Sequence, residues 1–117
     1  MSDKGRILVV EDDVLIGMLL GDMFEALEYD PPAQASNNFA ALEILNSESI
    51  VGALVDINLG GEKGWPVAAE LTRRGIQFAF TTGGGTEVPE AYRHIDVVTK
   101  PFRLKDIEAV VESFRQG

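Results

Sequence analysis

The chain has 117 residues, enough for one domain with its own hydrophobic core, and we expect residues 1–117 to form that single domain. Apolar residues make up 45% and charged residues 25% of the sequence, as in soluble globular proteins, and no apolar run is long enough to span a membrane. Acidic residues outnumber basic residues 19 to 10, and the resulting net charge of −9 argues against nucleic-acid binding by this chain.

Two further features of the composition concern where the protein works. The chain contains no cysteine, which excludes a disulfide framework and a thiolate metal site. The stretch Met1–Lys4 shows no basic segment leading into an apolar one, as an export signal would. Both observations favour a cytoplasmic protein that does not associate with membranes.

The first predicted strand is the continuous apolar run Ile7–Val10, which is typical of a strand buried on both faces of a parallel sheet. It ends at three consecutive acids, Glu11, Asp12 and Asp13. Apolar residues then recur with helical spacing, and Asp13 is well placed to cap the helix. The prolines that follow Asp30 end it.

The next segments predict an edge strand, a helix and a central strand. Ala33–Ala35 is a weak strand, which we place at the sheet edge because the prolines beside it cannot donate to a neighbouring strand. Asn37 or Asn38 caps the helix that follows. The run Ile50–Asp56 is a buried strand whose last residue, Asp56, lies at the exposed carboxyl end, before a glycine-rich stretch.

The second half of the chain continues the alternation. Pro66 suits the first turn of a helix that Gly75 ends. A strand at Gln77–Thr82 follows, then three glycines, and later a last strand at Asp96–Thr99. Apolar residues at helical spacing over Leu104–Phe114 predict a final amphipathic helix.

Alternation of about five strands with five helices predicts right-handed strand–helix–strand units and a parallel sheet with helices on both faces. In such a sheet the carboxyl ends of all strands share one edge, where ligands bind. Polar residues stand at the ends of four separate strands, and we expect them to meet at this edge: Glu11, Asp12, Asp56, Thr82 and Lys100.

The residue types at this edge favour phosphoryl chemistry. Three crowded carboxylates repel one another, and oxygen ligands without Cys or His favour a hard cation, Mg²⁺ or Mn²⁺. Lys100 offsets further negative charge, Thr82 donates a hydrogen bond, and Asp56 is the candidate nucleophile. Taken one at a time such residues have ordinary explanations, as helix capping does for Asp13, so the prediction depends on their combination.

At these residues the sequence resembles the response-regulator receiver domains of two-component signalling, and the resemblance covers essentially the whole chain. Glu11 and Asp12 match the acidic pair that holds Mg²⁺ in the family, and Asp56 matches its phosphorylated aspartate. Asn58 matches the residue whose main-chain carbonyl also binds the metal. The resemblance implies a flavodoxin-like, doubly wound (βα)5 fold with a parallel five-stranded sheet in the order 2-1-3-4-5.

The matches continue toward the end of the chain. Thr82 and Gly83 match the family's switch hydroxyl and its small neighbour. Lys100, Pro101 and Phe102 match the family's lysine and a lysine–proline peptide bond that is cis in the family. The resemblance implies that Thr82 turns toward the phosphate in the phosphorylated state and that Lys100 pairs with it.

The function implied by the resemblance is a temporary phosphorylation switch of a two-component phosphorelay, not a turnover enzyme. Asp56 takes a phosphoryl group from a sensor histidine kinase, and the acyl phosphate later hydrolyses. The partners implied are that kinase and a downstream protein target or phosphotransfer protein, so the protein serves as a relay, a phosphate sink or a contact regulator. We expect no output domain, because the chain ends about one helix after Lys100.

The sequence departs from the family pattern in two places. Gly83–Ile95 contains three consecutive glycines and a proline, which disfavour helix, so we expect the fourth helix to be disordered or at most a short turn around Glu90–His94. Val97 stands where many receivers carry an aromatic switch residue. Our hypothesis is that ordering of Gly83–Ile95 replaces that switch.

A closer resemblance lies in the run Phe80–Gly85. It is similar to the F-A-T-G motif of a single-domain receiver subfamily that has a weak fourth helix and is associated with kinases of the HWE type. Thr81 stands where that motif usually has alanine. Of the remaining residues, we expect His94 at the surface and Trp65 as a packing residue at the start of a helix.

Three other functions remain open on the sequence alone. A flavodoxin-like module would bind FMN, but Glu11–Asp13 occupy the place of its phosphate loop and would repel phosphate. An aspartate-nucleophile phosphohydrolase normally carries its nucleophile after the first strand, with insertions that this chain lacks. A pseudo-receiver would keep the fold without accepting a phosphoryl group.

Overall fold

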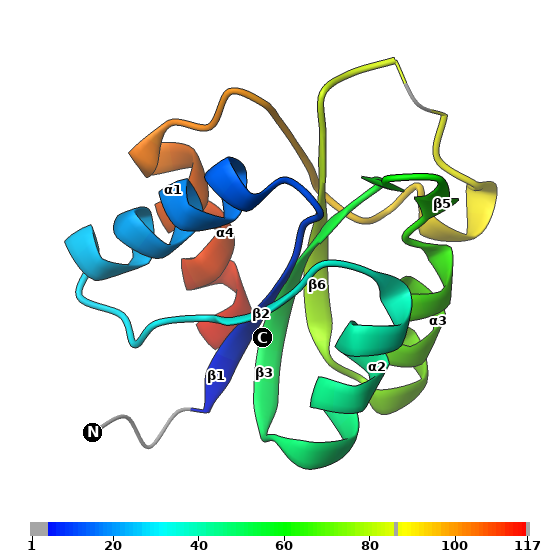
Figure 1. The fold of residues 1–117 in the computed structure, drawn as a ribbon, viewed down its shortest axis with the longest axis horizontal. Coiled ribbons are helices and arrows are strands. Elements are labelled where there is room, and N and C mark those ends of the chain that lie inside the picture. The colour runs from blue at the N-terminus through cyan, green and yellow to red at the C-terminus, as the bar shows by residue number, and fades with distance from the viewer. Residues whose placement is uncertain (1–4, 86, 117) are drawn as a thin grey trace.

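Residues 5–85 and 87–116 are described by the computed structural model. The expectations that fall on Met1–Lys4, Thr86 and Gly117 lie outside these described residues. Within them the chain forms one central sheet with two helices on each face (Figure 1).

The central sheet has five parallel strands in the spatial order β2-β1-β3-β6-β7, which confirms the predicted order. Its strands are β1 (Arg6–Val10), β2 (Ala33–Ala35), β3 (Ile50–Asp56), β6 (Gln77–Thr82) and β7 (Val97–Thr99). The weak strand β2 lies at one edge, as the neighbouring prolines predict, and β7 lies at the other. The carboxyl ends of β1, β3 and β6 therefore lie side by side at one edge of the sheet.

Helices α1 and α4 cover one face of the sheet, and α2 and α3 cover the other (Figure 1). Their bounds are α1 (Val14–Ala26), α2 (Asn38–Ser47), α3 (Trp65–Arg74) and α4 (Leu104–Gln116). Alternate residues of β3 serve the two sides: Leu54 packs with Phe24 and Ile107, whereas Val55 packs on the side of Leu71. None of these helices combines the length and the apolar character that crossing a bilayer requires.

The described residues contain four α-helices, one fewer than the alternation of the sequence predicts. Between β6 and β7 the described chain forms a single 3₁₀ turn, η1 (Glu90–Tyr92), in which Tyr92 N–H donates to the Pro89 carbonyl oxygen at 2.9 Å. This confirms the prediction of a short fourth helix. The reason is local, because consecutive glycines and a proline make a longer helix unfavourable there.

The predicted helix ends are confirmed where single side chains decide them. Asp13 Oδ1 accepts from the N–H groups of Leu15 and Ile16, so Asp13 caps α1. Of the two candidate caps for α2, Asn37 fills the role, because its Oδ1 accepts from Ala40 N–H at 2.8 Å. The side chain of Asn38 is left for another contact.

A small hairpin after β3 is the element that the sequence did not predict. Two antiparallel two-residue strands, β4 (Asn58–Leu59) and β5 (Glu62–Lys63), replace the expected glycine-rich loop. Gly60 makes the turn with a positive φ of 61°, a conformation that glycine adopts without steric cost. The hairpin starts two residues after Asp56, so its placement decides what surrounds that carboxylate.

Gly64 closes this hairpin against the strand that carries Asp56. Its N–H donates to the Ile57 carbonyl oxygen at 3.0 Å, and a Cβ added to it would lie 2.6 Å from the Asp56 carbonyl oxygen and 2.8 Å from Val55 Cγ1. We expect Gly64→Ala to lower the free energy of unfolding by about 1–3 kcal/mol, because backbone and core atoms have to move. Gly61→Ala is the matched control, since a Cβ there meets no atom within 4 Å.

Urea unfolding of the two variants measures the difference. The tight packing of Gly64 against β3 would be contradicted if Gly64→Ala were as stable as Gly61→Ala.

Candidate functional site

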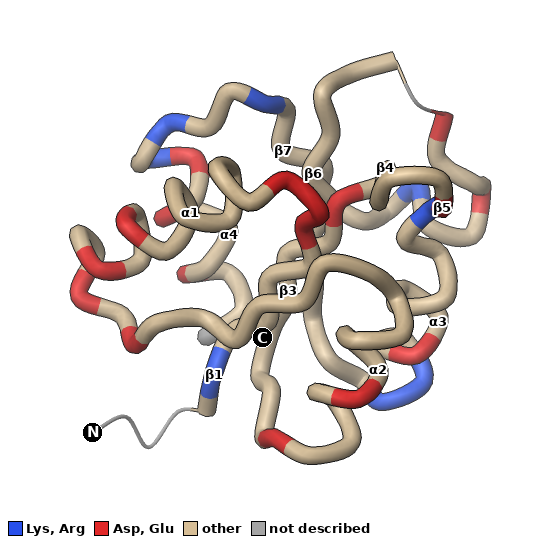
Figure 2. Tube along the Cα trace, in the orientation of Figure 1, with Lys and Arg blue, Asp and Glu red and all other residues tan. Residues whose placement is uncertain are grey.

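Three carboxylates meet where β1 and β3 end. Glu11 and Asp12 follow β1, Asp56 is the last residue of β3, and one oxygen from each lies within 4.8 Å of the others. Figure 2 shows acidic positions gathered at this edge of the sheet. Glu11 and Asp56 are buried, at 7% and 3% exposure, whereas Asp12 is exposed. The predicted acidic cluster is therefore formed, with one of its members open to solvent.

Lys100 supplies the positive charge in this cluster. Its Nζ lies 2.8 Å from Asp56 Oδ2 and 2.9 Å from Glu11 Oε1. Its backbone is held in place as well, because Lys100 N–H donates to the Thr82 carbonyl oxygen at 2.8 Å. The bond from Lys100 to Pro101 is cis, as predicted. One lysine thus faces two buried carboxylates, and its ammonium is the natural partner for additional negative charge.

Both oxygens of Asp56 are engaged. Oδ2 accepts from Lys100, and Oδ1 accepts from the backbone N–H of Asn58 at 3.1 Å. Two donors on separate elements therefore fix the plane of the Asp56 carboxylate. A carboxylate held in this way is oriented for attack without first losing side-chain freedom.

Glu11 is the carboxylate whose titration the fold changes most clearly. Burial raises the pKa of Glu11 to about 7; the negative charge of Asp56 acts in the same direction, while Lys100 and the backbone N–H of Asp13 oppose it. Burial also disfavours the charged form of Lys100, but its hydrogen bond to Asp56 and its ion pair with Glu11 outweigh this and raise the pKa of its ammonium. The site therefore holds more negative charge than its one lysine compensates.

One buried oxygen of Glu11 lacks a hydrogen bond of good geometry. Lys100 Nζ is 2.9 Å from Glu11 Oε1, but no donor described in the structure points correctly at this atom. A misaligned contact satisfies an acceptor poorly, so this oxygen stays without a hydrogen bond although the ammonium is close. An unsatisfied buried oxygen beside two further carboxylates fits a hard divalent cation. Glu11, Asp12 and Asp56 are thus able to hold Mg²⁺ or Mn²⁺.

Thr82 reaches the same edge through the register of the sheet. Asp56, the last residue of β3, pairs with Thr81 of β6. Thr82 is the next residue of β6 and therefore lies just past the end of β3. Thr82 is buried, and its Oγ1 accepts from Gly84 N–H at 3.0 Å, which leaves the hydroxyl its own hydrogen to donate. Gly83 is exposed just beyond it. The predicted switch residues therefore lie at the sheet edge that carries the acids.

An aromatic cluster of residues from α3, β6 and η1 joins η1 to the core. Tyr92 stacks on Trp65 with 6.0 Å between ring centroids, and Trp65 meets Phe80 edge-on at 5.5 Å. This confirms Trp65 as a packing residue at the start of α3. Val97, which stands where many receivers carry an aromatic residue, is exposed.

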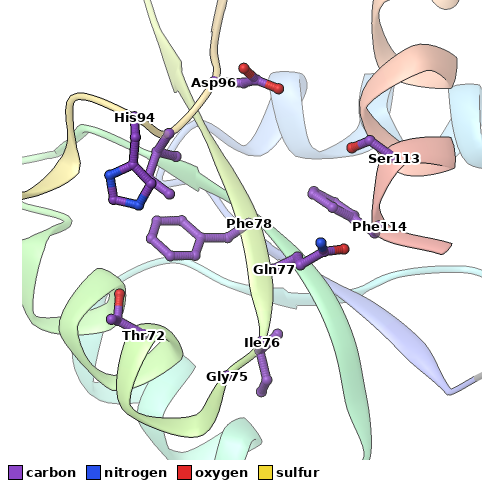
Figure 3. A pocket seen from close by; sticks show the side chains of 10 residues that line it. Thr72, Gly75, Ile76, Gln77, Phe78, His94, Asp96, Ser113 and Phe114 are labelled. Carbon is purple, nitrogen blue, oxygen red and sulfur yellow. The ribbon is translucent and has the colours of Figure 1, made fainter. Parts of the chain in front are cut away.

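His94 does not belong to the acidic site. It is exposed, as predicted, and lines a surface pocket of about 380 Å³ between the end of α3, the start of β6 and α4 (Figure 3). The pocket includes Gln77 and Phe78, the first residues of β6, whereas Thr82 is the last. His94 therefore lies toward the opposite end of the strand from the carboxylates.

Two residues near the site were not recognised as site residues from the sequence. Asn38 was considered only as a helix cap, yet its side chain bonds to the β4–β5 hairpin. The ammonium of Lys63 contacts the side-chain oxygen of Asn58, which is paired with it across the hairpin. The available signal was the Asn37–Asn38 pair, because one helix needs only one cap.

Comparison with known proteins places this arrangement in a family. The chain matches the response regulator receiver domain over residues 7–112. Aerobic respiration control protein ArcA from Escherichia coli (strain K12) is 32% identical over 107 residues, which cover 87% of this chain and 44% of ArcA. This chain thus spans less than half the length of that curated relative.

Solved structures agree with the family match. The solution structure of SdrG from Sphingomonas melonis Fr1 superposes with a TM-score of 0.83 at 36% identity, covering 98% of this chain and 99% of SdrG. The BeF3-activated conformation of SdrG from Pseudomonas melonis Fr1 gives a TM-score of 0.80 at 37% identity, with 97% and 98% covered. The five-stranded parallel sheet, the acidic cluster and these matches lead to one conclusion: this chain belongs to the response-regulator receiver domains of two-component signalling.

Proposed function

We propose that this protein is a phosphorylation switch in which Asp56 accepts a phosphoryl group from a phosphohistidine on a sensor histidine kinase. Membership of the receiver family implies phosphorylation-dependent signalling. The observation that carries the finer proposal is the Asp56 carboxylate, buried at a strand end and held between Lys100 Nζ and Asn58 N–H. A similar chain in a BeF3-activated conformation supports the same function.

In the transfer step an oxygen of Asp56 attacks phosphorus, and the bond between phosphorus and the donor imidazole nitrogen breaks. The imidazole keeps the electron pair and takes up a proton, and the product is an acyl phosphate on Asp56. The ammonium of Lys100, which pairs with the free carboxylate, then pairs with the phosphoryl oxygens. Thr82 turns its hydroxyl to donate to one of those oxygens, which links the chemistry to the end of β6.

The residues proposed to hold the metal are Glu11, Asp12 and Asp56, with the main-chain carbonyl of Asn58 as a further ligand. A bound Mg²⁺ would neutralise charge on the carboxylates and on the transferring phosphoryl oxygens. Mn²⁺ offers the same hard-cation chemistry. The unsatisfied Oε1 of Glu11 is the feature of the site that most clearly supports this assignment.

The switch returns to its starting state by hydrolysis of the acyl phosphate. Phosphoryl uptake and hydrolysis are both promoted by this chain's own residues, so we assign no turnover of a separate substrate. The phosphorylated form alters binding to a downstream protein target or a phosphotransfer protein, and this signalling takes place in the cytoplasm. A kinase of the HWE type is our proposal for the donor, from the motif at Phe80–Gly85.

Intact-mass spectrometry after incubation with Mg²⁺ and acetyl phosphate tests this function. We expect one phosphate adduct on the wild-type protein, which decays with time and is missing from Asp56→Asn. Failure to form an adduct from both acetyl phosphate and a cognate kinase would identify a pseudo-receiver and overturn the proposal.

The surface proposed to meet the kinase lies on the first turns of α1, directly after the acidic pair. Val14, Leu15 and Met18 are apolar side chains exposed at 74%, 76% and 61%. We expect Leu15→Glu to slow transfer from the kinase by about tenfold, because it places a charge in an apolar contact. Uptake from acetyl phosphate should be unchanged. Phe39→Glu is the matched control, since Phe39 is also exposed but lies on α2, across the sheet from α1.

Transfer rates from the kinase to each variant separate the two faces. Equal slowing by Leu15→Glu and Phe39→Glu would contradict the assignment to α1.

The segment between β6 and β7 is our candidate for the part that responds to phosphorylation. Apart from Val88, Tyr92 and Ile95, its described side chains from Glu87 to Ile95 are exposed, and η1 is a single turn. We expect fast amide hydrogen exchange over residues 87–94 in the unphosphorylated protein, and clear slowing when BeF3 or phosphate is bound. Strong protection without either, or no change on adding them, would exclude this segment as the replacement for the aromatic switch.

A further inference from the structure

Asn38 is a buried residue whose side chain leaves its own helix to contact the segment that follows Asp56. It is 6% exposed and stands in the first turn of α2. Its Nδ2 donates to the Lys63 carbonyl oxygen and to Glu62 Oε1, each at 2.8 Å, and its Oδ1 accepts from Val67 N–H at 3.2 Å. Both amide hydrogens and the oxygen are therefore used, and all three bonds reach residues 62–67.

Further polar contacts in the hairpin link the bonds donated by Asn38 to Asp56. The Lys63 carbonyl is held by Asn38, and the Lys63 ammonium contacts the side-chain oxygen of Asn58 on the paired strand. Asn58 N–H in turn donates to Asp56 Oδ1 at 3.1 Å. A connected series of polar contacts thus runs from α2 across β5 and β4 to one oxygen of Asp56.

The bond accepted by Asn38 fixes the other end of the hairpin. Helix α3 has Gly64 at its N-cap position and no side-chain cap of its own, so Asn38 Oδ1 satisfies the Val67 N–H from outside the helix. Gly64 packs against the Asp56 carbonyl, where a Cβ would lie 2.6 Å away. The bond from Val67 N–H to Asn38 therefore restrains the start of α3 and, through Gly64, the backbone beside Asp56.

We propose that Asn38 is a positioning residue for phosphoryl transfer: it anchors the β4–β5 hairpin to α2 and so keeps Asn58 N–H bonded to the Asp56 carboxylate. This inference rests on the proposed role of Asp56 as the phosphoacceptor. Asn38 touches neither the acids nor the lysine of the site in any described contact, so its effect is exerted through the orientation of Asp56.

The substitution Asn38→Asp separates anchoring from helix stability. It keeps the size of the side chain and an oxygen that accepts from Val67 N–H, and a carboxylate in the first turn of α2 favours the helix. It removes the donor and sets a negative charge against the Lys63 carbonyl and the Glu62 carboxylate. Asn37→Ala is the matched control, because it removes the cap bond to Ala40 N–H and no bond to the hairpin.

Two measurements are made on the full chain: the rate of phosphate uptake from acetyl phosphate with Mg²⁺, and amide hydrogen exchange at Asn58 without a phosphodonor. We expect Asn38→Asp to slow uptake by about tenfold or more, as loss of an outer-shell partner does, and to speed exchange at Asn58 by a similar factor. Asn37→Ala should match the wild type in both once rates are expressed per folded molecule. Asn38→Ser, which is uncharged and too short to reach Lys63, gives the same two readouts if the carboxylate disrupts folding.

Wild-type uptake and wild-type exchange at Asn58 in the Asn38 variants would overturn the inference. Equally slow phosphate uptake in Asn37→Ala would also overturn it, because the slowing would then be explained by lower stability of α2 alone. If the wild-type protein takes up no phosphate, the proposed function fails instead. Exchange at Asn58 then still decides whether Asn38 anchors the hairpin, because that measurement needs no phosphorylation.

Discussion

Replacing Lys100 with alanine should lower the free energy of unfolding by about 3 kcal/mol near pH 8, the order seen when one partner of a buried ion pair is removed. The physical reason is that Glu11 and Asp56, both buried, lose the ammonium that lies within 2.9 Å of each. Near pH 5.5 the loss should be smaller, because Glu11 then carries a proton and leaves one fewer charge unpaired.

Urea unfolding of Lys100→Ala at the two pH values measures this effect. Lys105→Ala is the matched control, because it removes an exposed lysine from α4 and the same unit of charge. Adding Mg²⁺ should restore part of the lost stability, since the cation replaces the ammonium among the acids. A loss no greater than that of Lys105→Ala would show that Lys100 does not compensate the buried carboxylates.

Replacing Glu11 with glutamine should stabilise the metal-free protein near pH 8 while weakening metal binding. The pKa of Glu11 rises from its ordinary value of 4.5 to about 7 on folding, and a shift of that size corresponds to about 3 kcal/mol. The unfolded chain releases this proton first as pH rises, so the folded state loses stability between about pH 4.5 and pH 7. Glutamine does not titrate, so its gain should be present near pH 8 and absent near pH 4.5.

Unfolding free energies across this pH range, with and without Mg²⁺, test the expectation. Glu43→Gln is the matched control, because it removes an equal charge from the exposed face of α2. We expect Glu11→Gln to lose at least about tenfold in Mg²⁺ affinity, because it removes a carboxylate ligand. A flat pH profile for the wild-type protein would mean that Glu11 folds without the cost that its burial imposes.

The expected effects of these two substitutions indicate a site whose charges serve function at a cost in folding stability. Glu11 is buried where its charge is unfavourable, and Lys100 offsets only part of it. The metal-free protein therefore keeps negative charge that is only partly compensated. A bound cation would relieve this repulsion, and Lys100 can later pair with a phosphoryl group.

The meeting of Glu11, Asp12, Asp56 and Lys100 was predictable because it follows from topology. Each residue lies at or just after the carboxyl end of a strand, and parallel strands in one sheet bring their carboxyl ends to one edge whatever the details of packing. Helix caps such as Asp13 were predictable for a similar reason, since the bonds involved are local.

The surroundings of Asp56 were not predictable because they depend on contacts between distant residues. The bond from Asn38 to the Lys63 carbonyl spans 25 positions, and neither residue carries a local pattern that indicates it. The β4–β5 hairpin has two residues in each strand, too few for an alternating pattern to emerge. The different burial of Glu11 and Asp12, which are neighbours in sequence, likewise depends on tertiary packing.

Phosphorylation of Asp56 would leave an acyl phosphate on this residue, which can be detected chemically. Borohydride reduces an aspartyl phosphate to homoserine but leaves a free carboxylate intact, so treatment of the phosphorylated protein followed by peptide mass spectrometry locates the modified residue. We expect conversion at Asp56 and at no other acid, dependent on Mg²⁺. Conversion at Glu11 or Asp12, or a phosphate that survives on a serine, threonine or histidine, would contradict it.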